Sequence, residues 1–398
     1  MDSGTRRSGA FLRVGVWRSC VRDGFSRRCR ASVGPGRLWA FVPAGRVMML
    51  YDAVRPLLFS LPAETAHGLG KSALRAVDGT PVASALERRF AVVDDRLSVD
   101  AFGESFRNPI GVAAGFDKNA EVVGGLAALG FGFVEVGGVT AEAQPGNPRP
   151  RMFRLREDEA IVNRMGLNNE GADAVGRQLR EDVAASVPVG VNLAKSEVAS
   201  MAEAPEDYRY TYERVAAGGD FFVVNVSCPN SEGFRDLQNR DELAAIFGAL
   251  VDAGASPLLV KLSPDLPEPA VEDALDLVDE FDLDGVVAVN TTTDRPASLS
   301  SPHASETGGL SGKPIEDEST RLVRFVAERT DVPVVGVGGV SDAAGAYAKI
   351  RSGASLVQLY TALVYEGPSI ARDVNRGLLE LLERDGFASV EDAVGADL

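Results

Sequence analysis

Lysines and asparagines that could bind a planar, anionic ligand follow the ends of strand-like apolar runs in this sequence. Lys118, Lys195 and Lys261 stand at three of these ends, although only six of the 41 basic residues are lysine. Asparagines stand at the same ends, at Asn192, Asn225, Asn230 and Asn290. An amide is a neutral donor and acceptor, which suits a ligand with imide and carboxylate groups. One or two such residues would be ordinary turn formers, whereas four indicate a ligand site.

Lys261 allows two interpretations. It could be a structural lysine held in an ion pair, or a cation placed beside the electron-rich ring of a flavin, where it would stabilise the reduced anion.

Cys228, between Ser227 and Pro229, also allows two interpretations. A free cysteine is commonly a small buried apolar residue, but a thiol with a pKa of about 8.5 can also act as a general base. Its position in a loop between asparagines favours the base. Covalent catalysis is disfavoured, because no histidine is placed to activate the thiol.

A glycine-rich run, Gly336-Val337-Gly338-Gly339, follows the seventh apolar run, and Tyr360-Thr361 follows the eighth. A glycine-rich strand end is often only a tight turn, but at this place in the repeat it predicts phosphate binding by backbone N–H groups. The chain has two histidines, His67 and His303, and no carboxylate–histidine pattern, so we expect no metal site. A phosphate without a metal indicates an organic cofactor.

The elements that must position these residues are eight apolar, β-branched runs that alternate with helical stretches. The runs are 108–115, 131–140, 188–194, 221–227, 257–263, 284–292, 333–340 and 356–363. Continuous apolar strands between helices indicate a parallel sheet covered on both faces. Eight units in about 270 residues predict an α/β fold, a (β/α)8 TIM barrel with its chemistry at the carboxyl ends of the strands. A doubly wound open sheet is the alternative, but no early strand–GxGxxG–helix unit supports it.

Four segments are expected along the chain. Residues 1–47 form a basic leader, either a transit peptide or, as we favour, an upstream artefact of a start at Met48 or Met49. In residues 48–90 we predict two short helices, because Pro56 and Pro62 interrupt the helical pattern. These helices could form a cap on the core or an amphipathic pair at a membrane surface. The barrel occupies 91–384, and 385–398 form an acidic C-terminal tail.

Charge narrows the class of protein. The net charge is −16, and because residues 1–47 carry ten arginines and two aspartates, the remaining residues carry −16 − 8 = −24. An acidic body argues against nucleic-acid binding and, with scarce lysine, indicates adaptation to concentrated salt. Three cysteines cannot form a disulfide framework. No apolar run reaches the roughly 18–20 residues of a membrane-spanning helix.

Five runs of residues, spread over the barrel, resemble the dihydroorotate dehydrogenase family, and specifically its membrane-associated, quinone-dependent class. They are 108–118, 144–151, 163–169, 225–230 and 307–312, and the resemblance extends from about Met49 to residue 384. It implies oxidation of (S)-dihydroorotate to orotate in pyrimidine biosynthesis, through FMN, with a quinone as acceptor. It also implies peripheral attachment to the cytoplasmic side of the cell membrane, without an obligatory protein partner.

The resemblance carries site residues over by position. Cys228 would take the C5 proton of dihydroorotate while hydride passes from C6 to the flavin. Substrate contacts are implied for Lys118, Asn163, Arg164, Met165, Gly166, Leu167, Asn225, Asn230, Asn290 and Thr291. Flavin contacts are implied for Ala114, Gly115, Phe116, Asp117, Lys118, Gly138, Asn192, Asn225, Lys261, Val289, Gly312, Gly339, Tyr360 and Thr361. A quinone site is implied at His67 and Arg154.

Three positions depart from the family pattern. The quinone-dependent class normally has serine at the base position, where the soluble class carries cysteine, as here at Cys228. Gly138 and Val289 stand where threonine is usual. Residues 49–90 match an extension that the soluble class lacks, so we expect the quinone-dependent class. The alternatives are a soluble-class enzyme that uses fumarate or an NAD-linked partner subunit and, less favoured, a non-catalytic nucleotide-binding barrel.

Overall fold

The computed structural model describes residues 50–181, 186–226 and 239–398, which belong to one compact unit. Two predicted site residues, Cys228 and Asn230, lie outside the described residues, as does the predicted leader 1–47. Among the described helices, none is long and apolar enough to cross a membrane.

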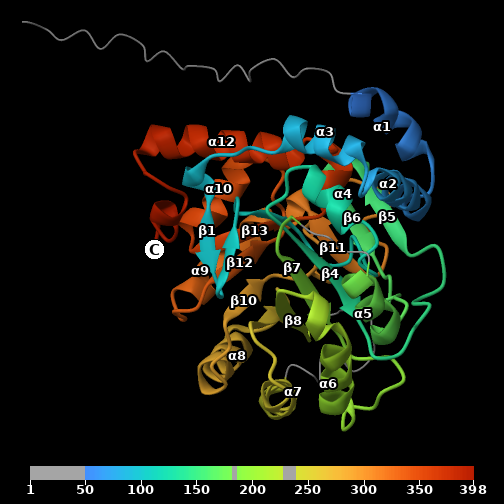
Figure 1. The fold of residues 1–398 in the computed structure, drawn as a ribbon, viewed down its shortest axis with the longest axis vertical. Coiled ribbons are helices and arrows are strands. Elements are labelled where there is room, and N and C mark those ends of the chain that lie inside the picture. The colour runs from blue at the N-terminus through green and yellow to red at the C-terminus, as the bar shows by residue number, and fades with distance from the viewer. Residues whose placement is uncertain (1–49, 182–185, 227–238) are drawn as a thin grey trace, which may run out of the picture. The chain divides into compact units, whose positions relative to one another are not determined.

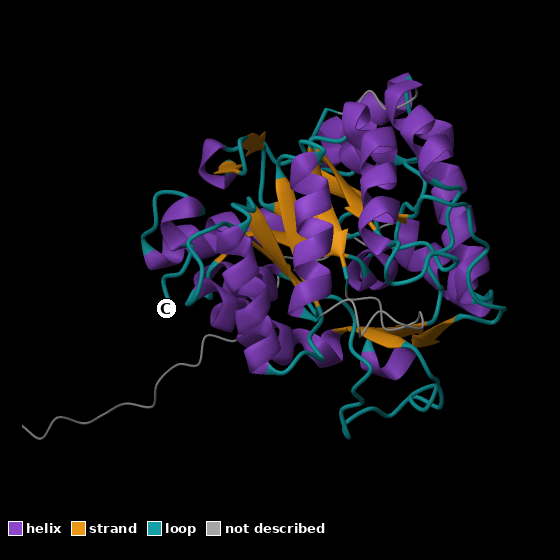
Figure 2. Cartoon of the chain, turned by 90° about the horizontal axis from the view of Figure 1, so that it is seen from below, coloured by secondary structure: helices purple, strands orange, loops and turns teal. Residues whose placement is uncertain are grey.

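Eight parallel strands close into a barrel, which confirms the predicted fold (Figures 1 and 2). Around the barrel the strand order is β10-β12-β13-β3-β4-β7-β8-β9. Their bounds are β3 Ile110–Val112, β4 Phe133–Val139, β7 Val189–Leu193, β8 Phe221–Asn225, β9 Leu258–Leu262, β10 Gly285–Ala288, β12 Val334–Val337 and β13 Ala354–Leu359. Seven of these strands lie within a predicted apolar run, and β13 begins two residues before the run 356–363. Every residue of β7, β8 and β9 is buried, as expected for a sheet covered on both faces.

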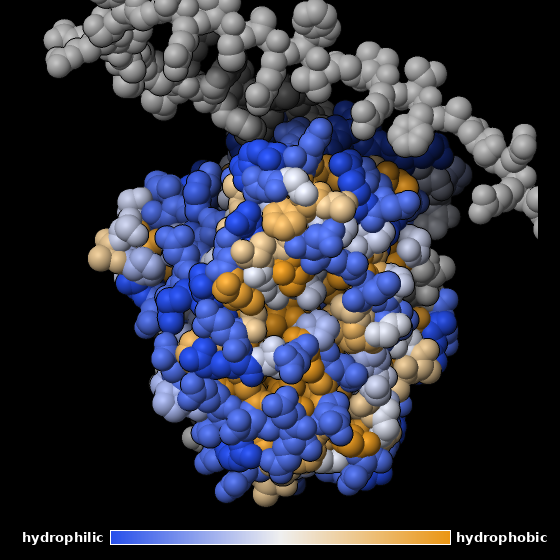
Figure 3. All heavy atoms as spheres, turned by 90° about the vertical axis from the view of Figure 1, so that its left-hand side faces the viewer, coloured by the Kyte–Doolittle hydropathy of each residue, from blue (hydrophilic) through white to orange (hydrophobic). Residues whose placement is uncertain are grey.

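Helices surround the barrel (Figure 2). They are α4 Val123–Ala128, α5 Ala172–Glu181, α6 Ala204–Val215, α7 Arg240–Asp252, α8 Glu268–Glu280, α9 Glu316–Ala327, α10 Ala343–Arg351, α11 Thr361–Glu366 and α12 Ile370–Asp385. Each longer helix buries one apolar stripe; in α9 these residues include Leu322, Val323 and Val326. On the face that carries α9 and α10, hydrophilic side chains predominate and apolar ones lie between them (Figure 3).

Two small antiparallel sheets lie outside the barrel, and neither was predicted. The hairpin of β1 (Val99–Ala101) and β2 (Glu104–Phe106) brings the Phe106 ring to 5.3 Å from that of Phe133, so it closes the amino-terminal end of the barrel. A three-stranded sheet in the order β11-β6-β5 consists of β5 Met152–Leu155, β6 Ala160–Asn163 and β11 Gly309–Gly312.

Three helices precede the barrel, where two were predicted: α1 Leu50–Ser60, α2 Ala63–Val77 and α3 Pro81–Phe90. Pro56 does not interrupt a helix, as was predicted, but lies inside α1. The break falls at Pro62, and a third helix begins at Pro81, where the proline stands in the first turn and needs no hydrogen-bonded N–H.

The last residues of the chain pack on the barrel's outer layer. Gly395 N donates to Ile350 O (3.0 Å), and Asp397 forms an ion pair with Arg351 of α10. Val390 and Ala393 are fully buried. The segment predicted as an acidic tail therefore lies folded against α10.

Candidate active site

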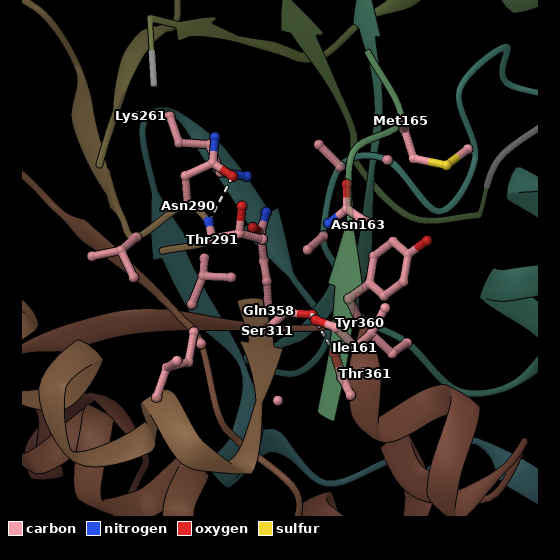
Figure 4. A pocket seen from close by; sticks show the side chains of 18 of the residues that line it. Ile161, Asn163, Met165, Lys261, Asn290, Thr291, Ser311, Gln358, Tyr360 and Thr361 are labelled. Carbon is pink, nitrogen blue, oxygen red and sulfur yellow. Dashed lines mark hydrogen bonds between the residues drawn. The ribbon is translucent and has the colours of Figure 1, made fainter. Parts of the chain in front are cut away.

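One cavity of about 1170 Å³, including space open to solvent, lies at the carboxyl ends of the barrel strands. Most predicted site residues line it: Ala114, Gly115, Lys118, Gly138, Asn163, Met165, Gly166, Leu167, Asn225, Lys261, Val289, Asn290, Thr291, Gly312, Gly339, Tyr360 and Thr361. Figure 4 shows Lys261, Asn290 and Thr291 on one wall, with Asn163 and Met165 opposite. The barrel topology explains why these residues lie together, because all eight parallel strands have their carboxyl ends at the same mouth of the barrel.

Three asparagines, one in the loop after β10, one on β8 and one on β7, form a directed chain of hydrogen bonds, here called the amide relay (Asn290, Asn225 and Asn192). Asn290 Nδ2 donates to Asn225 Oδ1 (3.4 Å), and Asn225 Nδ2 donates to Asn192 Oδ1 (2.9 Å). Asn192 Nδ2 donates in turn to Glu135 Oε1 (2.6 Å). Asn225 and Asn290 line the cavity, whereas Asn192 is fully buried behind them. Asn192 therefore acts on the cavity through Asn225.

Glu135 of β4 is a buried carboxylate that the sequence interpretation missed. It is fully buried, accepts a hydrogen bond from Gln358 Nε2 (2.5 Å), and lies 3.5 Å from Lys261 Nζ. Lys261 is thus ion-paired, as the first interpretation expects, and it also lines the cavity, where the second interpretation requires it to be. The available signal was a charged residue inside an otherwise apolar strand.

Lys118 supplies a cation at the cavity wall. Its Nζ donates to Gly115 O (2.6 Å), and the side chain is half-buried. Burial, together with the neighbouring charges of Lys71 and Arg151, lowers the pKa of Lys118 to about 8. The ammonium therefore remains charged at neutral pH but loses its proton in mild alkali. Such a cation can bind a carboxylate.

Glycines with positive φ shape another end of the cavity. Gly312, Gly338 and Gly339 have φ values of 101°, 112° and 78°. A Cβ at Gly339 would lie 2.3 Å from Glu316 Cα, so only glycine fits that position. Ser311 Oγ and Thr361 Oγ1 are 2.9 Å apart on the same wall. The predicted phosphate turn therefore forms a close-packed rim of backbone and hydroxyl groups.

The 163–167 segment covers the cavity after β6. Asn163, Met165, Gly166 and Leu167 line it, but Arg164 does not. Arg164 Nη1 donates to Glu306 Oε2 (2.9 Å), and its guanidinium lies 4.5 Å from the Phe153 ring centroid. Arg164 therefore anchors the 163–167 segment through Glu306 and Phe153.

Phe116 and Asp117 are buried and do not line the cavity. The Phe116 ring lies between those of His67 (4.8 Å between centroids) and Tyr360 (5.7 Å). His67 Nε2 is 3.0 Å from Phe116 O, and burial, with the charges of Lys118 and Lys71, lowers its pKa to about 3. His67 is therefore neutral at physiological pH and connects α2 to the cavity wall through edge-to-face ring contacts.

Arg154 of β5 holds the end of α1. It donates from Nη1 to Leu58 O (3.1 Å) and from Nη2 to Leu61 O. Its guanidinium also lies 4.7 Å from the centroid of the Phe59 ring. Arg154 thus does not line the cavity but joins the N-terminal helices to the sheet above it.

Seven other lining residues were missed: Ala113, Met152, Ile161, Ser311, Ile315, Val340 and Gln358. Val337 and Gly338, which also line the cavity, belong to the glycine-rich run predicted to bind phosphate. Most of the seven are apolar and gave no chemical signal. Gln358 is the exception, since it interrupts an apolar strand as Glu135 does. Its Oε1 is buried and has no hydrogen-bond partner among the described residues.

The donor set fits a flavin. An unpartnered buried acceptor at Gln358, a cation at Lys261 and cavity-lining amides at Asn225 and Asn290 match a planar ring with N–H and carbonyl groups. At the glycine rim an added Cβ would collide with packed protein atoms, so bare backbone lines the cavity there. Among the described residues, no group of three metal-ligating side chains is found.

Comparison with known proteins agrees with this geometry. Residues 96–382 match the family model for dihydroorotate dehydrogenase. A dihydroorotate dehydrogenase (quinone) of Haloarcula marismortui is 70% identical over 351 residues, 88% of this chain and 100% of the relative. One from Halobacterium salinarum is 62% identical, over 88% of this chain and 100% of its own length. These relatives come from halophiles, in line with the acidic composition.

A solved structure shows the same fold. The crystal structure of the dihydroorotate dehydrogenase of Eimeria tenella in complex with ferulenol superposes with a TM-score of 0.75 at 36% identity, over 83% of this chain and 95% of that one. The family match spans most of the chain, and the relatives far exceed 30% identity. The chain therefore belongs to the dihydroorotate dehydrogenase family.

Proposed function

We propose that this protein oxidises (S)-dihydroorotate to orotate in pyrimidine biosynthesis, with FMN as cofactor and a membrane quinone as acceptor. The observation that carries the proposal is the cavity itself, where Lys118 and Lys261 stand on a wall with the amide relay. Its relatives from halophiles bear the name dihydroorotate dehydrogenase (quinone). Bound in the cavity, the flavin would take up two electrons from the substrate and give them to the acceptor.

The residues that would hold FMN fall into two groups. Lys261 and Gln358 would face the ring, where a fixed positive charge stabilises added negative charge. Gly312, Gly339 and Thr361 would hold the phosphate through backbone and hydroxyl groups. The close packing of Gly339 on Glu316 supports this rim, because it leaves the backbone accessible on the cavity side.

The residues that would hold the substrate come from several parts of the cavity wall. Lys118 would bind the carboxylate, and Asn163, Asn225 and Asn290 would orient the ring through hydrogen bonds. Cys228 would accept the C5 proton. This role comes from the family resemblance, and Cys228 lies outside the described residues.

The quinone and the membrane would meet the enzyme at α1–α3, so we propose residues 48–90 as a membrane-facing extension of the 91–384 barrel. Leu57 is 66% exposed and Leu69 is 50% exposed, as in helices that insert apolar side chains into a lipid surface. Edge-to-face contacts between the His67, Phe116 and Tyr360 rings connect this extension to the cavity. We propose peripheral attachment to the cytoplasmic face of the cell membrane.

A visible spectrum followed by an acceptor survey tests the function. We expect a yellow protein that releases FMN on denaturation and whose flavin dihydroorotate bleaches. A quinone should reoxidise the flavin faster than fumarate or NAD. Faster reoxidation by fumarate would instead assign the soluble class, and a colourless protein would contradict the proposal.

A further inference from the structure

Glu135 is a buried carboxylate with three partners that come from three other strands. Its Oε1 accepts from Asn192 Nδ2 (2.6 Å) on β7 and lies 3.5 Å from Lys261 Nζ on β9. Its Oε2 accepts from Gln358 Nε2 (2.5 Å) on β13. A buried charge persists only when it is paired and hydrogen-bonded. These contacts meet that condition without any ligand.

The carboxylate also fixes the direction of its neighbours, because an ionised carboxylate only accepts hydrogen bonds. Asn192 must turn its NH2 group toward Glu135, so its Oδ1 accepts from Asn225. Gln358 must turn its NH2 group the same way, which leaves its Oε1 without a partner among the described residues. Glu135 therefore determines which atoms the neighbouring side chains can offer to a ligand.

The charge of Glu135 opposes that of Lys261. A lysine beside a flavin ring favours the reduced, anionic form, and so raises the midpoint potential. Both side chains are almost completely buried, at 5% exposure for Lys261 and 0% for Glu135, so solvent screens their fields weakly. A carboxylate 3.5 Å from the ammonium must offset much of that effect.

We propose that Glu135 is a positioning residue that acts through Lys261 and Gln358 and keeps the midpoint potential of the bound flavin low. A low potential favours passing the electron pair onward to the acceptor. Gln358 Oε1, held in place by Glu135, accepts a hydrogen bond from the ring. This inference rests on the proposed function, since it requires a flavin in the cavity.

The test is the flavin midpoint potential, measured by equilibrium titration against a reference dye at constant pH. Glu135→Gln keeps the shape and removes the charge. We expect it to favour the reduced flavin by at least about tenfold, which is about 30 mV upward for a two-electron couple. Glu87→Gln is the control, because it also removes one carboxylate from an ion pair, here with Arg107 and far from the barrel mouth. The flavin midpoint potential of this variant should equal that of the wild-type protein.

A charge-swap variant separates the electrostatic role from a merely structural one. In Glu135→Gln/Gln358→Glu the carboxylate moves to the neighbouring side chain, and the new glutamine can still accept from Asn192 and donate to position 358. We expect the swap to return the potential most of the way to the wild-type value. If Glu135→Gln is folded but retains no flavin, recovery of flavin in the swap supports the proposal, and no recovery overturns it.

The outcomes are distinct. A folded, flavin-loaded Glu135→Gln protein with the wild-type potential overturns the inference, as does a swap that leaves the potential raised. If Glu135→Gln does not fold, Glu135→Asp decides, because withdrawing the carboxylate from Lys261 should also raise the potential, and an unchanged value overturns the inference. A wild-type protein without flavin would contradict the proposed function itself.

Discussion

Lys71 of α2 lies 3.3 Å from Asp117 Oδ1, and Asp117 directly precedes Lys118 of the cavity wall. The N-terminal extension thus places a positive charge close to the cation that would bind the substrate carboxylate. The charge of Lys71 lowers the pKa of Lys118, in addition to burial. The extension and the substrate site are therefore coupled electrostatically.

The pKa of Lys118, at about 8, predicts how orotate binding depends on pH. Only the protonated lysine attracts the carboxylate, so affinity should stay constant below pH 8. Above it, affinity should fall roughly tenfold per pH unit as the ammonium loses its proton. Titration of the oxidised enzyme with orotate, followed by the flavin spectrum, measures this without turnover. An affinity that stays constant to pH 10 would exclude Lys118 as the carboxylate ligand.

Lys71→Gln should move that pH dependence upward. Without the neighbouring charge the pKa of Lys118 rises toward its ordinary value, so orotate binding should persist to higher pH. Arg75→Gln is the control. Arg75 lies on the same helix and, like Lys71, forms an ion pair with Glu121, but it is not among the charges that shift the pKa of Lys118. Equal shifts in the two variants would show that the helix, rather than the Lys71 charge, is responsible.

Leu57→Glu and Leu69→Glu should weaken membrane binding, because both side chains are exposed apolar groups of the extension. Removing one such contact with lipid costs about 2 kcal/mol, a loss of more than tenfold in partitioning. Co-sedimentation with vesicles and quinone reduction should both fall, while reduction of the flavin by dihydroorotate is unchanged. Val198 lies on the barrel and is 81% exposed, so Val198→Glu is the control and should leave vesicle binding, quinone reduction and flavin reduction unchanged. A similar loss in this variant would show that the added negative charge, rather than the lost lipid contact, is responsible.

Gly339→Ala should abolish flavin retention. Its φ of 78° costs an alanine roughly 1 kcal/mol, and the added Cβ would also lie 2.3 Å from Glu316 Cα. Gly254→Ala separates these effects, because Gly254 has a φ of 82° and nothing within 4 Å of an added Cβ. The flavin-to-protein absorbance ratio reports the result. Equal, small losses in both variants would show that the glycine rim does not hold the cofactor.

Cys228→Ala should reduce turnover by about 10² to 10⁴ at neutral pH while flavin stays bound, the usual contribution of a general base. Cys228→Ser should retain activity with an optimum at higher pH, because a hydroxyl ionises less readily than a thiol. Stopped-flow reduction of the flavin by dihydroorotate measures the step directly. Full activity of the alanine variant would exclude Cys228 as the base.

The barrel could be predicted from the sequence because its strands are buried on both faces and read as continuous apolar runs. The sheet above the cavity could not. β11, Gly309–Gly312, contains two glycines and has low intrinsic strand propensity, so only its pairing with β6 makes it a strand. The proline rule failed at Pro56, which α1 accommodates.

The site was predictable where a polar residue ends a strand or is one of the few lysines. Asn225 is the last residue of β8, and Lys261 stands before the last residue of β9; both gave a clear signal. Glu135 and Gln358 stand within β4 and β13, and only three-dimensional closure brings them together. Arg164 and Arg154 were placed in the site by position, but their contacts in the fold lie with Glu306 and Leu58.

The hydrogen bond between Glu135 and Gln358 joins residues 223 positions apart. Forming it requires the first and last parts of the barrel to meet, and the loop-closure entropy of that long separation opposes it until the other strands are in place. The Glu135 carboxylate therefore has its full set of partners only in the closed barrel. Closure of the barrel and completion of these hydrogen bonds are thus coupled.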